Sequence, residues 1–522
     1  MVDENANPPV NGSASEAAPV PEKASWKSRI GQFFKFKVRD PLLTLGAQAW
    51  PGAVAGAVAA FLVAVLFFGS LGRTGLGLVP DILLLGLVGL VALFLTWKLL
   101  ELVFSLVRAL PKPFVGVVGG AVIVLLLTGF PFVVAFLLAG VVSGAAIGAA
   151  WKRGLKRFSS VLLLIIPVAI YGFMGVTLLR EGEDPFADLQ KPESAAGVPT
   201  LSAPNPSLPG RYVVKTLTYG CGTDAHRPEF GTGAALKTPT VDGSALLDEP
   251  SALQGWLRQA YWGFDLKHLP LNGTVWYPDG PGPFPLVLVV HGNHTAKEFS
   301  DPGYAYLGEL LASRGFITVS VDENFLNGEW YGDYQQKENP VRAWLLLQHL
   351  KVWRGWNAAA GNPFRGKADL GRVVLIGHSR GGQAVALAAA FNPLPCHPEK
   401  TDVKFDFRFG IRGIVQIAPN DPARPSGQPL EVRDVHYLLL QGGYDSDVNM
   451  FLGDRQYRRV KFTNPEYRRK TMLYIYRANH GQFNTVWGRT DYGAPTAWLL
   501  NLAPLMSGEE QRQIAKVYIG AF

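Results

Sequence analysis

The sequence has little charge. Only 17% of its 522 residues are Asp, Glu, Lys or Arg, whereas 48% are hydrophobic, and this balance excludes a disordered polypeptide. It also contains no internal repeat at the period of a solenoid protein, which excludes that class. The length leaves room for two or three domains.

The basic excess is absent from most of the chain. The net charge is +8, but residues 181–522 carry 34 basic and 34 acidic residues, so the whole surplus lies in residues 1–180, with 15 against 7. A nucleic-acid-binding domain needs a basic surface of its own. The balanced remainder therefore disfavours nucleic acid as a partner.

Residues 1–180 contain long apolar runs with few charges. These runs cover 41–72, 79–100, 113–151 and 158–179, and a helix needs about 20 apolar residues to cross a bilayer. The run 113–151 is too long for one crossing and contains the turn-forming sequence Gly129-Phe130-Pro131. The pattern predicts about five transmembrane helices, and buried helices of a large soluble protein are the alternative.

Basic residues predict the orientation of these helices, because Lys and Arg in short loops stay on the cytoplasmic side. With a cytoplasmic N-terminus, 13 of the 15 basic residues before residue 181 fall inside. Four crossings would instead export the cluster at 152–157. We therefore expect a multi-pass protein of the cell membrane, in contact with the lipid bilayer, whose C-terminal part is extracytoplasmic. No cleavable signal peptide is expected, since the first apolar run starts late.

From about residue 270, apolar strand-like runs alternate with helical stretches, which predicts a mostly parallel sheet with helices on both faces. A helix is expected at 341–357, with Asn339 as its cap and Pro340 in its first turn. In such sheets, functional residues gather at the carboxyl ends of the strands. The expected strands are 285–290, 316–321, 372–376, 413–417, 435–440 and 471–476.

The third of these strands leads into Gly377-His378-Ser379-Arg380-Gly381, and a helix of small residues follows. This G-x-S-x-G pattern between a strand and a helix is typical of a nucleophile elbow, which exposes the serine hydroxyl. The alternative is an ordinary glycine-rich turn without a catalytic role. We predict that Ser379 is a catalytic nucleophile.

A catalytic serine needs a base and an orienting acid, which follow in the order Ser, Asp, His in this arrangement. Asp445 comes after the strand 435–440, and His480 comes after the strand 471–476. We favour Asp445 as the acid because it is the first acid after the turn. Asp447 is its close competitor, and Asp421 is expected to be a turn residue.

Two backbone N–H groups are needed to stabilise an oxyanion. Arg380 follows the nucleophile and supplies one, and Asn293, in the loop after the strand 285–290, is the candidate for the other. His291 and His294 in the same loop are reminiscent of a metal pair, but no convincing third ligand accompanies them. We therefore expect neither a metal nor a cofactor.

The motifs HGN, GHSRGG, GGYDSD and ANHGQFN, in this order and spacing, resemble the α/β-hydrolase superfamily. They are most similar to bacterial dienelactone-hydrolase-like, platelet-activating-factor-acetylhydrolase-like or chlorophyllase-like proteins. The resemblance covers about residues 265–500 and implies a triad of Ser379, Asp445 and His480 that cleaves carboxylic esters of small molecules or lipids. An envelope acyltransferase with the same triad and a non-catalytic sensor or binding domain are the alternatives.

Together these inferences predict a fold class of N-terminal transmembrane α-helices plus a C-terminal α/β-hydrolase domain. The expected domains are a polar and then basic tail at 1–40, the transmembrane region at 41–180, a linker at 181–210 and the hydrolase domain at 211–522. Aromatic residues between Glu323 and Tyr334 either line an acyl pocket or pack a loop. The sequence leaves open whether Cys221 and Cys396 pair.

Overall fold

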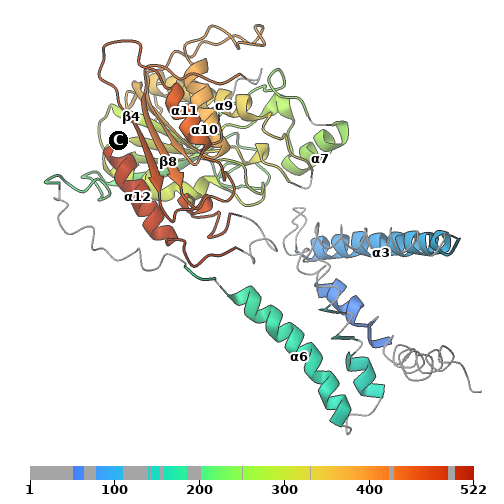
Figure 1. The fold of residues 1–522 in the computed structure, drawn as a ribbon. Coiled ribbons are helices and arrows are strands. Elements are labelled where there is room, and N and C mark those ends of the chain that lie inside the picture. Colours follow the sequence, from blue (N-terminus) through green and yellow to red (C-terminus); the bar gives the residue numbers. More distant parts are fainter. Residues whose placement is uncertain are drawn as a thin grey trace, which may run out of the picture. The chain divides into compact units, whose positions relative to one another are not determined.

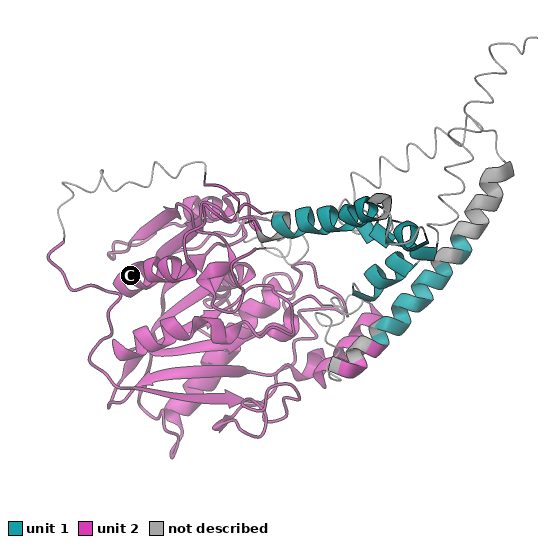
Figure 2. Ribbon diagram, turned by 90° about the horizontal axis from the view of Figure 1, so that it is seen from below, with its two compact units in different colours: residues 1–69, 84–177 teal, residues 70–83, 178–522 magenta. Residues whose placement is uncertain are grey.

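The fold is described from a computed structural model (Figure 1). It describes residues 51–53, 55–63, 78–109, 139–140, 143–144, 146–152, 158–180, 182–184, 201–249, 251–329, 331–421, 428–491 and 500–522. The chain divides into two compact units, one formed by 1–69 and 84–177 and the other by 70–83 and 178–522 (Figure 2). The predicted domain boundaries stay predictions.

The larger unit is built on a mixed sheet of nine strands in the order β2-β1-β3-β5-β4-β6-β7-β8-β9. Strand β3 pairs antiparallel with β1 and with β5, whereas the ladder from β5 through β9 is parallel. The strands are β1 Val214–Gly220, β2 Leu236–Lys237, β3 Asn272–Pro278, β4 Phe284–Val290, β5 Ile317–Asp322, β6 Ala368–His378, β7 Ile411–Ile417, β8 His436–Gly442 and β9 Lys470–Ile475.

Alternate side chains of the central strands point to opposite faces of the sheet, because successive residues of a strand do so. Leu286 and Leu288 of β4 belong to one core cluster, and Val287 and Val289 belong to another. Helices α9 and α10 cover the first face, and α8 and α12 cover the second. The helices are α7 Ala252–Trp262, α8 Ala305–Ser313, α9 Asn339–Ala358, α10 Arg380–Phe391, α11 Leu452–Arg459 and α12 Gly508–Ala521.

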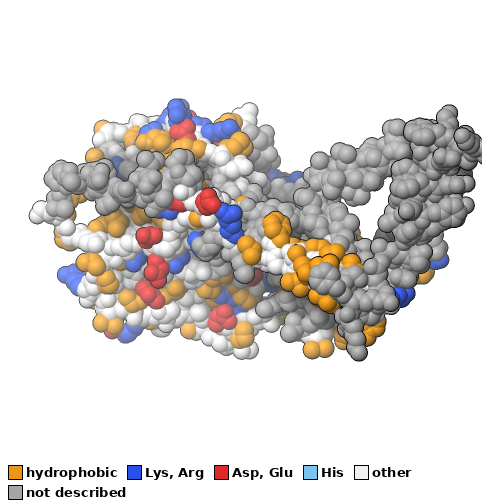
Figure 3. Space-filling model, turned by 60° about the horizontal axis from the view of Figure 1, so that its bottom comes forward, with side chains coloured by type: hydrophobic (Ala, Val, Ile, Leu, Met, Phe, Trp, Pro, Cys, Tyr) orange, Lys and Arg blue, Asp and Glu red, His pale blue; other side chains and the backbone are white. Residues whose placement is uncertain are grey.

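The six strands expected from the sequence are β4 to β9, within a few residues at each end. Helix α9 was also expected, although its N-cap residue is Glu338 rather than Asn339. The surface of this unit carries charges of both signs side by side on the face seen in Figure 3, in keeping with the equal numbers of acidic and basic residues in 181–522. Cys221 and Cys396 are both free thiols.

The other unit is helical where it is described. It includes most of α3, Leu78–Ala109, and nearly all of α6, Phe158–Leu179. Two further helical segments, within 51–63 and 139–152, pack closely through glycines: a Cβ added to Gly52 would lie 2.2 Å from the carbonyl oxygen of Gly144, and one on Gly56 would lie 2.5 Å from that of Gly140. Only residues without a side chain permit such an approach.

The prediction of a membrane-spanning region has to be corrected. In the described part of the chain, no helix is long and apolar enough to cross a membrane. The predicted fold class with five transmembrane helices is therefore wrong, and so is the predicted location as a multi-pass membrane protein with an extracytoplasmic catalytic domain. Much of the runs 41–72 and 113–151 lies outside the described residues.

The physical reason for this error is visible where those runs are described. The sequence interpretation assigned these apolar runs to membrane-spanning helices. Small residues of the segments 51–63 and 139–152 are instead buried against protein, and these include Ala53, Ala139, Ala146, Ala149 and Ala150. Apolar run length alone does not distinguish the two environments.

Candidate active site

Ser379 lies at a sharp turn between β6 and α10. Its backbone has φ 56° and ψ −124°, a conformation that non-glycine residues rarely adopt. Glycines make the turn possible: a Cβ on Gly377 would lie 2.1 Å from the carbonyl oxygen of Gly381, and one on Gly381 would lie 2.5 Å from that of Val290. The sequence therefore folds locally into the strained elbow that was expected, with the serine at its apex.

The loop after β4 passes directly beside Ser379. A Cβ on Gly292 would lie 2.4 Å from the Ser379 Cβ and 2.9 Å from its Oγ. The side chain of Asn293 is held away from the serine, since its Oδ1 accepts a hydrogen bond of 3.0 Å from the Gly328 N–H. Within the described residues, the backbone N–H groups of Asn293 and Arg380 donate to no backbone carbonyl, which is compatible with their predicted role as oxyanion donors.

His480 and Asp445 are in contact. The Nδ1–H of His480 donates to Oδ2 of Asp445 at 2.9 Å, and both side chains are almost fully buried. The other oxygen of Asp445 accepts from the Val448 N–H at 2.7 Å, and Gln441 donates to Oδ2 at 3.1 Å. Asp445 is thus fixed by its own turn, and it fixes the orientation of the imidazole.

The Nε2 atom of His480 faces a second carboxylate, that of Asp447, at 3.4 Å. A third carboxylate, Asp491, accepts hydrogen bonds from the backbone N–H groups of His480, at 3.1 Å, and Gly481, at 2.8 Å. Burial alone would lower the pKa of His480, but these three carboxylates raise it to about 9. They favour the imidazolium form.

Aromatic rings hold the imidazole of His480 from the side. The rings of Trp487 and His480 stack nearly parallel at 5.8 Å between centroids, and His294 stacks on Trp487 at 5.4 Å. His378 donates from Nε2 to the carbonyl oxygen of His480 at 3.1 Å and accepts from the Tyr304 hydroxyl at 3.0 Å. Burial lowers the pKa of His378 far below its usual value, so it is neutral. The elbow and the His480 loop are thereby joined.

His291 is structural, and both of its ring nitrogens are engaged. Its Nδ1–H donates to the Gly292 carbonyl at 2.7 Å, and its Nε2 accepts from the Glu323 N–H at 3.0 Å. Burial lowers the pKa of His291 to about 3. Its ring therefore orients the loop that carries Asn293, and no ring lone pair is left for a metal.

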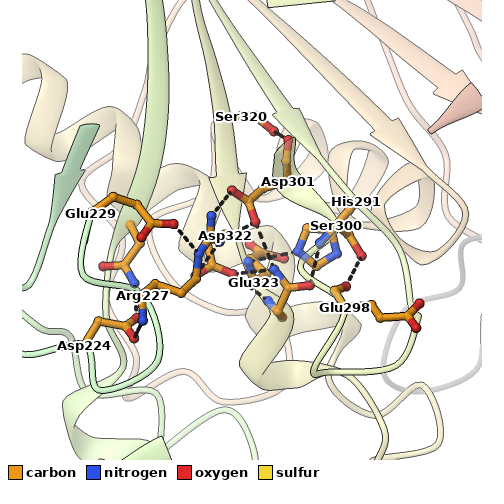
Figure 4. Close-up of polar contacts among 12 residues, drawn as sticks. Asp224, Arg227, Glu229, His291, Glu298, Ser300, Asp301, Ser320, Asp322 and Glu323 are labelled. Atoms are coloured by element: carbon orange, nitrogen blue, oxygen red, sulfur yellow. Dashed lines mark hydrogen bonds and ion pairs between the residues drawn. The ribbon is translucent and has the colours of Figure 1, made fainter. Parts of the chain in front are cut away.

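Figure 4 shows His291 and Glu323 beside a buried charge cluster centred on Arg227. The guanidinium of Arg227 donates to Asp301 at 2.5 and 3.0 Å and lies 3.4 Å from Asp322. Asp301 and Asp322 also accept from the amide of Asn324. These contacts hold the start of the loop after β5 in place.

A second charged group supports the elbow. The Arg380 guanidinium bonds Glu338 at 2.7 Å and Asp333 at 3.3 Å, and Glu338 lies 3.8 Å from Arg342. Arg342 in turn approaches Glu323 at 3.4 Å. The side chain of Arg380 is therefore neutralised by carboxylates, and its backbone N–H remains for the site.

The remaining sequence candidates have structural surroundings. Asp421 pairs with Arg459. Phe325, Tyr331 and Tyr334 are buried in the core, which favours loop packing over an acyl pocket, and Trp330 lies outside the described residues. Sequence reasoning missed Trp487 and Asp491, for which no spacing motif exists. The roles assigned to Ser379, Asp445, His480, Asn293 and Arg380 stay predictions.

No family model matches the chain. It is 32% identical over 124 residues to a bis(hydroxyethyl) terephthalate hydrolase from Streptomyces coelicolor. The match covers 23% of this chain, and the chain spans 34% of that enzyme's length. This limited similarity supports a relationship to hydrolases of carboxylic esters.

Proposed function

We propose that the protein is a serine hydrolase that cleaves carboxylic esters through a covalent acyl-enzyme. The observation that carries the proposal is the 2.9 Å hydrogen bond between His480 and Asp445, on loops that follow adjacent parallel strands. Ser379 at the strained elbow supplies the nucleophile. The similarity to a terephthalate-ester hydrolase agrees with this reaction class.

In the proposed reaction, the Ser379 hydroxyl attacks the ester carbonyl while Nε2 of His480 takes its proton. The backbone N–H groups of Asn293 and Arg380 stabilise the oxyanion that forms. The imidazolium then protonates the leaving alcohol. Water, deprotonated by His480, releases the acid from Ser379. Asp445 keeps Nδ1 protonated throughout, so that Nε2 is the basic nitrogen.

Labelling with a fluorophosphonate probe tests the nucleophile in the full chain. The wild type should be labelled, and Ser379→Ala should be neither labelled nor active. Ser313→Ala is the control, because Ser313 is also buried but its hydroxyl bonds a helix carbonyl. This variant should retain labelling. Equal labelling of wild type and Ser379→Ala, or none of either, would refute the proposal.

The acyl acceptor is tested separately with short-chain 4-nitrophenyl esters and with bis(hydroxyethyl) terephthalate. Release of free acid in the presence of an alcohol is expected for a hydrolase. Accumulation of the transesterified ester instead would identify an acyltransferase with the same nucleophile.

A further inference from the structure

Asp447 is the carboxylate nearest to the reactive nitrogen of His480. Its Oδ2 lies 3.4 Å from Nε2, whereas Asp445 holds Nδ1 on the other side of the ring. The Asp447 side chain is 51% exposed, and that of Asp445 is 2% exposed. Asp447 thus lies beside the buried Nε2 of His480 and reaches the surface, on the side from which an ester would approach the nucleophile.

Several carboxylates lie around this position. Besides Asp445 and Asp447, the buried backbone around His480 is held by the carboxylate of Asp491. On the neighbouring loop, the Glu298 carboxylate lies 3.5 Å from His294 Nδ1, and burial lowers the pKa of that histidine. The nearest guanidinium on the elbow, Arg380, is already paired with Glu338 and Asp333.

We infer that Asp447 determines substrate specificity by disfavouring esters that carry a carboxylate on the acyl chain. This inference rests on the proposed function and names its substrate class: uncharged or cationic esters. Two like charges a few ångströms apart at a partly exposed site repel by an amount that corresponds to about tenfold in rate. Half-exposure keeps this effect below that of a buried pair.

The same charge assists turnover. Hydrolysis converts the ester and one water into an alcohol and a carboxylic acid, and the acid loses its proton to solvent. The product carboxylate is then held beside Asp447. Repulsion disfavours its rebinding, so inhibition by the acid product should be weak.

The test compares two esters of equal chain length, 4-nitrophenyl hexanoate and mono-4-nitrophenyl adipate, which differ in one terminal carboxylate. For the wild type, kcat/KM should be about tenfold or more higher for the hexanoate. Asp447→Asn should reduce this ratio by about tenfold, and Asp447→Lys should lower it further or invert it. High salt should also narrow the ratio, because it screens the charge.

Glu466→Gln is the matched control. Its side chain is 65% exposed and precedes β9, whereas His480 follows that strand, so the variant loses the same charge at the opposite end. The ratio should be unchanged in this variant. An unchanged ratio in both Asp447 variants would overturn the inference, whereas failure of the wild type to cleave either ester would instead refute the proposed function.

Discussion

The carboxylates around His480 determine the pH range in which its imidazole can act as a base. Burial opposes the charged ring, yet Asp445, Asp447 and Asp491 raise its pKa to about 9. A general base must be unprotonated, so kcat/KM should rise with pH and level off above about pH 9. Titration of released acid at constant pH measures this profile.

The same profile in Asp447→Asn provides the comparison. Loss of one attracting carboxylate should move the inflection to lower pH, because the imidazolium loses a stabilising charge. Glu466→Gln should leave it in place. A wild-type profile with its inflection below pH 7 would contradict the raised pKa.

Gly292 makes a testable contribution at the residue scale. A Cβ there would lie 2.4 Å from the Ser379 Cβ and 2.8 Å from the His378 carbonyl oxygen. Gly292→Ala should therefore displace the loop of Asn293 and lower kcat by about a hundredfold, the scale of losing one oxyanion donor. Steady-state kinetics of the folded variant measure this loss.

Gly355→Ala is the control for that substitution. Gly355 lies in α9, and a Cβ there meets nothing within 4 Å. Alanine should leave kcat unchanged and raise stability by up to about 1 kcal/mol, since it is the better helix former. An equal loss of kcat in both variants would show that Gly292 has no special position.

The positions of three candidate site residues in the fold, though not their roles, were predictable because these residues follow strands. Ser379, Asp445 and His480 each come directly after a recognisable apolar run, so strand order alone placed them at one edge of the sheet. Asp447 and Trp487 were not predictable in their present contacts. Their proximity to His480 depends on the path of two loops, which no local sequence pattern encodes.

At the scale of elements, α12 is the support for the His480 loop. Gln511 is fully buried, donates to the Asn479 carbonyl at 2.8 Å and accepts from the Asn479 N–H at 3.1 Å. Gln511→Ala would leave both backbone groups unpaired, which should cost about 2–4 kcal/mol of unfolding free energy and lower kcat. Chemical denaturation and kinetics measure the two effects.

Gln513 lies two residues further along α12 and is exposed. Its side chain donates a hydrogen bond to Ser207 rather than to the His480 loop. Gln513→Ala should change stability by less than about 1 kcal/mol and leave kcat unaltered. If Gln511→Ala behaved in the same way, α12 would not support the His480 loop.

The elements also show which patterns the sequence encodes clearly. Strands β4 to β8 were expected because their apolar runs are nearly continuous, as strands buried on both faces require. The edge strand β9 was expected from its apolar run although most of its side chains are exposed or half-buried. Strands β1, β2 and β3 were missed. The sequence of β1, Val-Lys-Thr-Leu-Thr-Tyr-Gly, is half exposed and has no apolar run, and β3 begins with Asn272-Gly273.

The apolar runs before residue 180 misled for the opposite reason. Their composition does indicate helices, and α3 and α6 lie on two of them. Composition does not state what the helices contact. The close Gly52 to Gly144 approach is a tertiary contact between segments about 90 residues apart, and the sequence does not state which segments pair.

At the scale of the whole molecule, the Arg227 cluster connects distant parts of the chain. Arg227 follows β1, Asp301 begins the turn before α8, and Asp322 ends β5, yet all three side chains are buried together (Figure 4). Arg227→Met should destabilise the fold by about 3–5 kcal/mol, because two carboxylates remain buried without a cation.

The pH dependence of this variant gives a specific signature. Burial raises the pKa of Asp301 to about 6 even beside Arg227. Without Arg227 this pKa stays above that of the unfolded chain, so the folded state binds more protons and is stabilised as the pH falls. As the pH is lowered from 8 to 5, the difference in melting temperature between Arg227→Met and the wild type should therefore become smaller. A constant difference would contradict this explanation.

The backbone at Ser379 limits which chemistries this scaffold can acquire. A φ of 56° is strongly unfavourable for a residue that branches at Cβ. Threonine is therefore excluded at this position although it carries the same hydroxyl, whereas cysteine, which is unbranched, fits the same backbone. Descendants of this protein can thus exchange an oxygen nucleophile for a sulfur one by a single substitution, but a threonine nucleophile would require a different turn.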